Sequence, residues 1–219
     1  MKLFLDTADT NIIKKYLPTG LIDGVTTNPS LLAQNGTSPK KNILDILSLF
    51  KEGVISVEIT EDDPQKAYLQ AKKIAAISPH ILVKIPCHKN YYPVIHQLKK
   101  ENIPLNITLV FSAIQGLLMA KLGVEYISPF IGRWDDIDID GTQVIRELRM
   151  IMDTYGFKTK ILAASIRHVR HVHESLLAGA DAITIPGALF EKIIAHPLTD
   201  QGIQQFNIDW IKTNTTQFP

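Results

Sequence analysis

The sequence has a single cysteine and no long apolar run. Cys87 is the one cysteine among 219 residues, and a lone thiol cannot form a disulfide within its own chain. That usage fits a reducing compartment, so we expect a cytoplasmic protein. The opening segment, residues 1–6, has only a short apolar stretch and predicts no signal peptide. No run approaches the roughly 18 apolar residues that span a bilayer, which predicts no membrane insertion.

Excess charge of either sign is also missing. The chain has 23 Lys plus Arg against 22 Asp plus Glu, for a formal net charge of +1. Without basic blocks or a basic stripe there is no electrostatic basis for binding nucleic acid or an anionic membrane. An apolar fraction of 45% and a charged fraction of 21% exclude a disordered chain. We therefore expect a globular protein with neither nucleic acid nor membrane as a partner.

What the sequence does contain is a regular alternation of short apolar runs with longer amphipathic segments. The apolar runs are rich in Val, Ile and Leu and mostly lack strict alternation, which is typical of parallel strands buried on both faces. The predicted strands are 3–5, 22–25, 54–59, 81–85, 103–109, 124–127, 160–164 and 182–185. The clearest predicted helices between them are 40–50, 64–77, 91–100, 113–122, 144–155 and 169–178.

Eight strand–helix units without a break in composition predict one (β/α)8 TIM barrel, a single domain over residues 1–219. An open, doubly wound sheet is the alternative. One segment, about 200–212, is a helix too many for the barrel, with Ile203, Phe206 and Trp210 at i, i+3 and i+7. An apolar stripe on a surplus helix predicts contact with another subunit, whereas the alternative is that the helix folds back over its own barrel.

In such barrels the working residues lie at the carboxyl ends of the strands. Lys84 is the strongest anomaly there, because its strand is otherwise wholly apolar and lysine is almost never fully buried without a partner. Desolvation can lower the pKa of a lysine amine by several units and so create a nucleophile. The alternative is a structural lysine that snorkels at the strand end or pairs with a carboxylate.

Two carboxylates lie at the ends of apolar strands that face the same mouth, Asp6 on the first predicted strand and Glu58 on the third. Asp6 and Glu58 around Lys84 would supply acid and base groups for carbanion chemistry. As alternatives, Asp6 could cap a helix and Glu58 could form a structural salt bridge with Lys84. Asp9 suits the capping role better than Asp6, because it lies nearer the start of the following helix.

The end of the seventh strand predicts an anion site. Ser165 and Arg167 follow that strand and open a helix, and phosphate sites in barrels frequently lie after strands seven and eight. Arg133, one strand earlier, could reach the same place and bind phosphate oxygens through its forked guanidinium. The alternative is that either arginine simply covers the barrel rim.

Other polar groups favour structural roles. His168, His171 and His173 stand at i, i+3 and i+5, which does not place three ligands on one helix face, so we predict no metal site. No neighbouring histidine or carboxylate argues that Cys87 is a thiolate nucleophile. The acidic segment 135–140 lacks the pattern of a calcium loop and predicts a solvated loop.

Five segments around the predicted strands together resemble the signatures of the transaldolase family, in its small-subunit group. The segments are Thr-Thr-Asn-Pro-Ser at 26–30, Val-Lys-Ile-Pro at 83–86, Asn-Ile-Thr-Leu-Val-Phe-Ser at 106–112, Ser-Pro-Phe-Ile-Gly-Arg at 128–133 and Ala-Ala-Ser-Ile-Arg at 163–167. The resemblance covers essentially the whole chain and includes fructose-6-phosphate aldolase, which shares the compact barrel. It implies Schiff-base chemistry without a metal or organic cofactor, and assembly as rings of five that often pair into ten.

The resemblance also implies a role for each matching residue. Lys84 forms the Schiff base, Asp6 takes the proton of the C4 hydroxyl, and Glu58 moves protons with a water that Thr108 positions. Asn28, Asn106 and Ser128 would bind the hydroxyls of the dihydroxyacetone unit. Arg133, Ser165 and Arg167 would bind the phosphate. Sugar phosphates are thus the expected substrates: sedoheptulose 7-phosphate and glyceraldehyde 3-phosphate would give erythrose 4-phosphate and fructose 6-phosphate, as in the pentose phosphate pathway.

Two positions bear on the choice between transfer and cleavage. Transaldolases resemble this chain in having a glutamate at position 58 and a phenylalanine at position 130, where the aldolase has glutamine and tyrosine. A phenylalanine cannot protonate the carbanion, so Phe130 would keep the intermediate alive for transfer. The sequence therefore favours a transaldolase, with a fructose-6-phosphate lyase and a noncatalytic sugar-phosphate-binding barrel as the alternatives.

Overall fold

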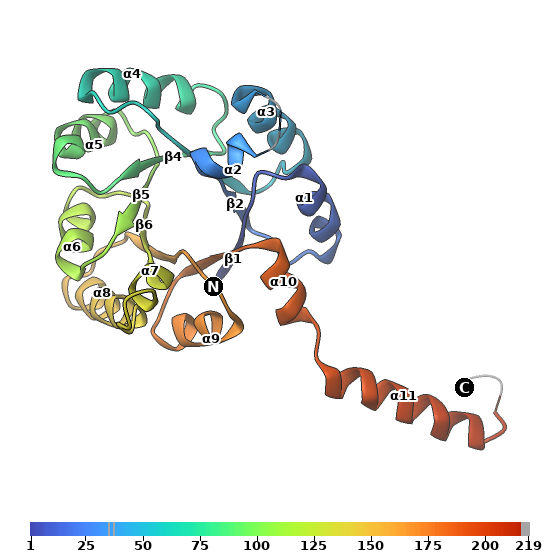
Figure 1. Ribbon diagram of the computed structural model, residues 1–219. Coiled ribbons are helices and arrows are strands. Elements are labelled where there is room, and N and C mark those ends of the chain that lie inside the picture. Colours follow the sequence, from blue (N-terminus) through green and yellow to red (C-terminus); the bar gives the residue numbers. More distant parts are fainter. Residues whose placement is uncertain (35, 37, 216–219) are drawn as a thin grey trace.

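Eight parallel strands close into a barrel in the order β1 to β8, and each strand is followed by at least one helix (Figure 1). The computed structural model describes residues 1–34, 36 and 38–215, so the last four residues of the predicted domain lie outside the described residues. The strands are β1 (Lys2–Asp6), β2 (Gly24–Thr26), β3 (Val54–Glu58), β4 (Ile81–Pro86), β5 (Leu105–Val110), β6 (Tyr126–Pro129), β7 (Lys160–Ala163) and β8 (Ala182–Ile185). The predicted (β/α)8 barrel is confirmed, and the open sheet is excluded.

Three strands begin later than the sequence predicts. Ile22, Ile103 and Val124 precede β2, β5 and β6 instead of starting them. Each packs in or against the hydrophobic core without entering the strand ladder. Apolar character indicates that a residue is buried, not that it is hydrogen-bonded in a sheet. Before these three strands, buried and partly buried residues lie outside the strand pairing.

All the helices of the described chain except α11 lie around the outside of the barrel (Figure 1). The helices are α1 (Thr10–Tyr16), α2 (Pro29–Ala33), α3 (Pro39–Leu49), α4 (Pro64–Ala75), α5 (Tyr92–Lys100), α6 (Ala113–Lys121), α7 (Ile131–Asp135), α8 (Thr142–Tyr155), α9 (Val169–Leu177), α10 (Gly187–Ile194) and α11 (Pro197–Lys212), with short 3-10 turns η1 (Leu17–Thr19) and η2 (Lys89–Tyr91). Asp9 caps α1 by accepting a hydrogen bond from the backbone N–H of Asn11, at 2.8 Å, which leaves Asp6 free of the capping role.

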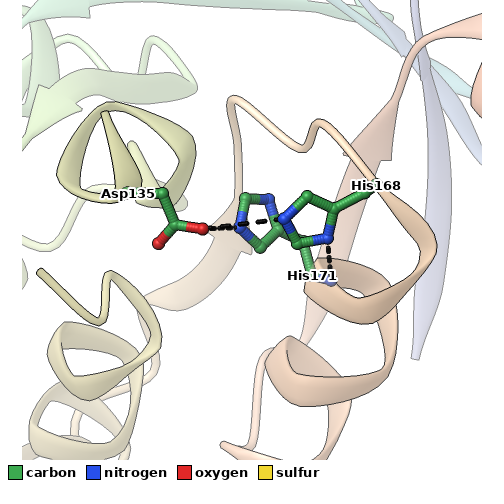
Figure 2. Close-up of side chains that lie close together, drawn as sticks. All are labelled: Asp135, His168 and His171. Carbon is green, nitrogen blue, oxygen red and sulfur yellow. Dashed lines mark hydrogen bonds and ion pairs between the residues drawn. The ribbon is translucent and has the colours of Figure 1, made fainter. Parts of the chain in front are cut away.

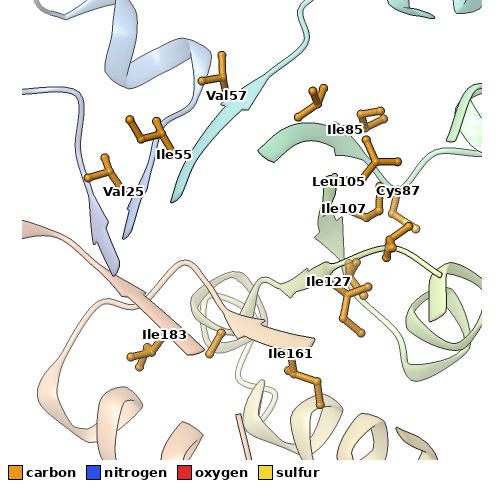
Figure 3. Packing of buried hydrophobic residues seen from close by; sticks show 14 of the residues in the cluster. Val25, Ile55, Val57, Ile85, Cys87, Leu105, Ile107, Ile127, Ile161 and Ile183 are labelled. Atoms are coloured by element: carbon orange, nitrogen blue, oxygen red, sulfur yellow. The ribbon is translucent and has the colours of Figure 1, made fainter. Parts of the chain in front are cut away.

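Apolar side chains fill the barrel on both sides of its wall. Outward-facing residues such as Val25, Ile55 and Ile107 pack under the helices (Figure 3). Inside, a smaller cluster closes the amino-terminal end and consists of Phe4, Leu82, Tyr126, Leu162 and Ala182. Because strand side chains alternate, the residue two positions after each of these also points inward, one layer nearer the carboxyl-terminal mouth.

Helix α11 leaves the barrel and extends away from it (Figure 1). No residue of α11 is buried, and Phe206 is 74% exposed. Leu198, Ile203 and Ile211 are exposed as well, so the alternative in which this helix folds back over its own barrel is wrong. Across the described part of the chain, every helix is too short or too polar to cross a membrane.

Candidate active site

The layer above the apolar plug is polar, and it lines a cavity at the carboxyl-terminal mouth. Two positions after Phe4, Leu82 and Tyr126 come Asp6, Lys84 and Ser128. The cavity has a volume of about 230 Å³ and is lined by Asp6, Thr26, Asn28, Lys84, Asn106, Ser128, Phe130, Arg133, Ala164, Ser165, Arg167 and Thr184. Every predicted site residue except Glu58 and Thr108 is in this lining. A larger cavity at the other end of the barrel, about 560 Å³, lies away from this constellation.

Lys84 is buried, with 5% of its surface exposed, and it has two partners. Its Nζ lies 3.1 Å from Glu58 Oε2 and donates a hydrogen bond to the backbone carbonyl of Thr27 at 3.0 Å. The pairing follows from strand register, because Glu58 and Lys84 are neighbours across β3 and β4. The salt bridge proposed as an alternative role for Glu58 therefore exists, and it places a proton acceptor beside the amine.

Asp6 accepts a hydrogen bond from the hydroxyl of Thr26, at 2.8 Å. Thr26 Oγ1 lies 2.6 Å from the hydroxyl of Thr184, and since the Thr26 proton goes to Asp6, Thr184 must donate to Thr26. Burial raises the pKa of the Asp6 carboxyl above its usual range, although the charge of Lys84 and the bond from Thr26 act in the opposite direction. A carboxylate of raised pKa suits a residue that takes up and returns protons.

The roles of Thr26 and Thr184 were not predicted from the sequence. Both occupy inward-facing positions on β2 and β8, the two strands that flank β1. Strand alternation in the sequence predicts that both side chains face inward, but a threonine at a strand end is too common to indicate a contact with Asp6.

Thr108 lies fully buried beside an irregularity in β5. The register with β6 shifts between Ile107 and Val110, and Leu109 adopts a φ of 55°. Bulges of this kind commonly redirect a side chain next to an active site, and a positive φ is costly for leucine. The Thr108 hydroxyl has no hydrogen-bond partner among the described residues. A buried, unpaired hydroxyl of this sort suits an ordered water or substrate atom as its partner.

The predicted hydroxyl-binding residues Asn28, Asn106 and Ser128 all line the cavity, and the last two are hydrogen-bonded to each other. Asn106 donates from Nδ2 to Ser56 Oγ at 3.1 Å and accepts from Ser128 Oγ at 2.7 Å, so both ends of its amide are oriented. Asn28 caps α2 by accepting from the backbone N–H of Leu31 at 2.9 Å. Its amide nitrogen makes no hydrogen bond to the described residues and remains available as a donor.

The predicted anion residues converge on one side of the cavity. Ser165 adopts a φ of 60°, and the N–H of Gly132 donates to its carbonyl at 3.1 Å. A Cβ on Gly132 would lie 2.1 Å from that carbonyl oxygen, so only glycine permits this approach. Arg133 stacks over the Phe130 ring, 5.2 Å from its centroid, and pairs with no carboxylate in the described part of the chain. The Arg167 guanidinium instead forms a forked ion pair with Asp136.

Residues 135–140 are exposed to solvent, as the sequence predicts, but they also make specific contacts that it does not predict. Asp135 contacts His171, Asp136 binds Arg167, and Asp140 accepts from both the N–H and the hydroxyl of Thr142. These contacts tie the segment to α9 and to the start of α8. Tertiary pairing, which the local sequence does not reveal, accounts for the difference.

A second titratable cluster lies beyond the cavity and contains Asp135, His168 and His171 (Figure 2). Their ligand atoms lie within 4.8 Å of one another. The cluster differs from the three histidines considered in the sequence, because His173 is exposed and takes no part. Burial opposes ionisation of Asp135, but its hydrogen bond with His171 helps to outweigh that effect, and the pKa of Asp135 lies below its usual range.

The fold and this mouth define a barrel enzyme with a buried lysine paired with Glu58, in a cavity that Asp6, Arg133 and Arg167 also line. The chain belongs to the Transaldolase/Fructose-6-phosphate aldolase family, whose model matches residues 3–217. Family membership agrees with the resemblance seen in the sequence.

Curated relatives match over almost their whole length. A probable transaldolase of Phenylobacterium zucineum (strain HLK1) is 46% identical over 213 residues, covering 97% of this chain and 98% of the relative. A probable transaldolase of Lactiplantibacillus plantarum (strain ATCC BAA-793 / NCIMB 8826 / WCFS1) is 46% identical over 217 residues, covering 99% and 100%. Among solved structures, flavocytochrome b2 with sulfite bound has a TM-score of 0.60 at 13% identity, with 85% of this chain and 56% of that chain covered. That likeness shows the barrel fold alone.

Proposed function

We propose that this chain is a transaldolase that moves a dihydroxyacetone unit between sugar phosphates through a Schiff base on Lys84. The donor would be sedoheptulose 7-phosphate or fructose 6-phosphate, and the acceptor an aldose phosphate. The observation that carries the proposal is the buried Lys84 amine, 3.1 Å from Glu58 and in the same cavity as Asp6. The lone, buried cysteine supports placing this activity in the cytoplasm.

In the first half-reaction the neutral Lys84 amine attacks the C2 carbonyl of the ketose, and water leaves as the iminium forms. Asp6 takes the proton of the C4 hydroxyl, the C3–C4 bond breaks, and the aldose product departs. The electron pair left on C3 is delocalised into the iminium. In the second half-reaction C3 attacks the aldehyde carbon of the acceptor, Asp6 returns its proton, and water releases the ketose product.

Glu58 and Thr108 would manage the protons of Schiff-base formation. Glu58 is close enough to take a proton from the Lys84 ammonium directly. The unpaired Thr108 hydroxyl suits the water that is released when the iminium forms and taken up when it is hydrolysed. Asn28, Asn106 and Ser128, which line the cavity, would hold the hydroxyls of the bound unit. We expect these roles to require neither a metal nor an organic cofactor.

The deciding experiment compares product formation from fructose 6-phosphate with and without erythrose 4-phosphate. A transaldolase forms sedoheptulose 7-phosphate rapidly and releases little free dihydroxyacetone, whereas a lyase releases dihydroxyacetone at a similar rate without an acceptor. Borohydride trapping with fructose 6-phosphate tests the noncatalytic alternative, because a pure binder gives no covalent adduct. Release of dihydroxyacetone as fast as transfer would instead assign the chain to the aldolase branch.

The double variant Glu58→Gln with Phe130→Tyr should shift the balance from transfer towards cleavage. A tyrosine hydroxyl at position 130 would bring a proton donor to the cavity, where the phenylalanine ring now stacks with Arg133. We expect a higher ratio of free dihydroxyacetone to transferred product, measured by coupled assay of both. Phe111→Tyr, on the ring that packs edge-on against Phe130 at 6.1 Å, is the control and should leave the ratio unchanged. An unchanged ratio in the double variant would remove the proposed role of these two positions.

Arg133→Ala should weaken the binding of phosphorylated substrates more than Arg167→Ala does. A charge-assisted contact is worth about 1.5–3 kcal/mol, so its loss should raise KM roughly ten- to hundredfold. Arg167 shares its donors with Asp136, so its net contribution should be smaller. Arg170→Ala is the control, because Arg170 pairs with Glu174 on the outside of α9. Equal losses on unphosphorylated fructose would show that these arginines do not read phosphate.

We also propose that α11 is an oligomer contact of an otherwise single-domain chain over 1–219, and that the assembly is a ring of five or a pair of such rings. The support is the apolar surface of α11, which the barrel leaves exposed. Truncation after Pro197 should reduce the mass measured by light scattering to that of one chain, and Phe206→Ser should weaken the assembly. A full-length chain that is monomeric at micromolar concentration would contradict the proposal.

A further inference from the structure

Two imidazoles face one carboxylate oxygen in the cluster of Asp135, His168 and His171 (Figure 2). His171 Nε2 contacts Asp135 Oδ2 closely, and His168 Nε2 lies 3.6 Å from the same oxygen. The two rings are in contact, with their centroids 3.6 Å apart and their planes tilted by 40°. The His171 side chain is only 3% exposed, so its polar atoms need partners within the protein.

Backbone N–H groups fix the tautomer of both rings. The N–H of His171 donates to Nδ1 of His168 at 3.2 Å, and the N–H of Arg167 donates to Nδ1 of His171 at 3.3 Å. A neutral imidazole has one acceptor nitrogen and one donor nitrogen. Because Nδ1 is the acceptor in both rings, Nε2 carries the proton in both, and both protons face Asp135.

This arrangement opposes a metal at the cluster. A metal would need the Nε2 lone pairs, and a ligating histidine normally donates its other N–H outward to an acceptor. Here the other nitrogen of each ring already accepts a backbone N–H. His168 instead caps α9 by accepting the N–H of His171, and the His171 ring accepts the N–H of Arg167, just before the helix.

The cluster joins the two segments that carry the anion residues. Asp135 is the last residue of α7, which carries Arg133. His168 is the N-cap of α9 and His171 lies in its first turn, shortly after Ser165 and Arg167. Ser165 has a φ of 60°, a conformation that persists only where the surrounding structure determines it. The bond from the Arg167 N–H to His171 fixes the backbone two residues after this strained position.

We propose that His171, together with His168 and Asp135, is a positioning group that sets the distance between Arg133 and the Ser165–Arg167 segment. It thereby determines the preference for phosphorylated over unphosphorylated sugars. The inference rests on the proposed function, in which that side of the cavity takes the substrate phosphate. His171 itself lines no part of the cavity and acts through the residues it holds.

The test compares His171→Phe with His173→Phe, a matched control because His173 is an exposed histidine on the same helix. We expect His171→Phe to raise KM for fructose 6-phosphate about tenfold or more, as for loss of a charge-assisted contact, with kcat and the KM for unphosphorylated fructose nearly unchanged. Affinity for inorganic phosphate, measured by calorimetry, should fall in parallel. Asp135→Asn, which keeps an acceptor oxygen, should retain more affinity than Asp135→Ala. If His171→Phe does not fold, this Asp135 pair carries the comparison.

Several results would overturn the inference. If His171→Phe weakens the binding of phosphorylated and unphosphorylated substrates equally, the role of His171 is merely structural. If its affinity for inorganic phosphate is unchanged, His171 does not position the anion residues. Nitrogen NMR of the parent should find His171 protonated at Nε2, so protonation at Nδ1 instead would refute the tautomer. Stoichiometric binding of added Zn²⁺ to the parent, abolished in His168→Ala, would also refute the assignment of the Nε2 protons. Failure of the proposed function is distinguishable, because it would appear as a parent protein that gives no borohydride adduct.

Discussion

Lys84→Met is expected to fold and to lose turnover by a factor of about 10⁴ or more, the scale seen when an enzyme's nucleophile is removed. Methionine keeps the apolar stem and nearly the volume of lysine, so the packing around β4 should survive. The change leaves Glu58 without the cation 3.1 Å away, and some stability should be lost because a largely buried carboxylate loses its partner. Steady-state transfer assays and thermal unfolding measure the two effects separately.

Lys99→Met is the matched control for this variant. Lys99 is also a partly buried lysine paired with a glutamate, Glu125, but it lies outside the cavity. It should lose stability and keep its activity. Borohydride trapping in the presence of fructose 6-phosphate then identifies the nucleophile. A stable adduct on the Lys84→Met protein would mean that another lysine forms the Schiff base.

Asp6→Asn is expected to lower kcat by about 10² to 10⁴, the usual contribution of a positioned general base, while raising stability at neutral pH. The asparagine can still accept the hydrogen bond from Thr26, but it cannot take the C4 hydroxyl proton. Asp9→Asn is the control, because asparagine caps a helix as well as aspartate does, and it should change neither quantity.

The sign of the stability effect follows from the raised pKa of Asp6. Between the ordinary aspartate pKa and the raised folded-state value, the folded protein binds more protons than the unfolded chain. Stability of the parent therefore falls as pH rises through that window, and Asp6→Asn escapes the loss. The melting-temperature advantage of the variant should grow with pH across the window and level off above it. If the melting-temperature advantage of Asp6→Asn shrinks as pH rises, the folded protein favours the ionised form of Asp6 and its pKa is not raised.

The parts of the site that sequence reasoning found are those dictated by strand geometry. A lysine inside an otherwise apolar strand indicates a role beyond packing. Once a parallel barrel is predicted, Asp6 and Lys84 must lie at the same end of it. The same reasoning separated Asp9, the helix cap, from Asp6. These inferences need only the period-two pattern and the rule that barrel chemistry lies at the carboxyl ends of the strands.

The parts it missed depend on contacts between distant segments. Helices α2 and α7 have five residues each, too short to produce a periodic pattern. The pairing of Asp136 with Arg167 and of Asp135 with His171 joins residues 31 and 36 positions apart, in segments whose approach the local sequence does not encode. Capping by His168 was equally hidden, because histidine is not among the preferred N-cap residues.

The hydroxyl chain from Thr184 through Thr26 to Asp6 has a consequence for how activity arises during folding. Asp6 lies near the start of the chain, but its buried setting is complete only when β8, near the other end, pairs with β1. A growing chain that has already made both Asp6 and Lys84 still lacks the strand that closes the barrel. Catalytic competence should therefore appear with ring closure and not before. The rate at which turnover recovers during refolding should therefore report the rate at which the first and last strands pair.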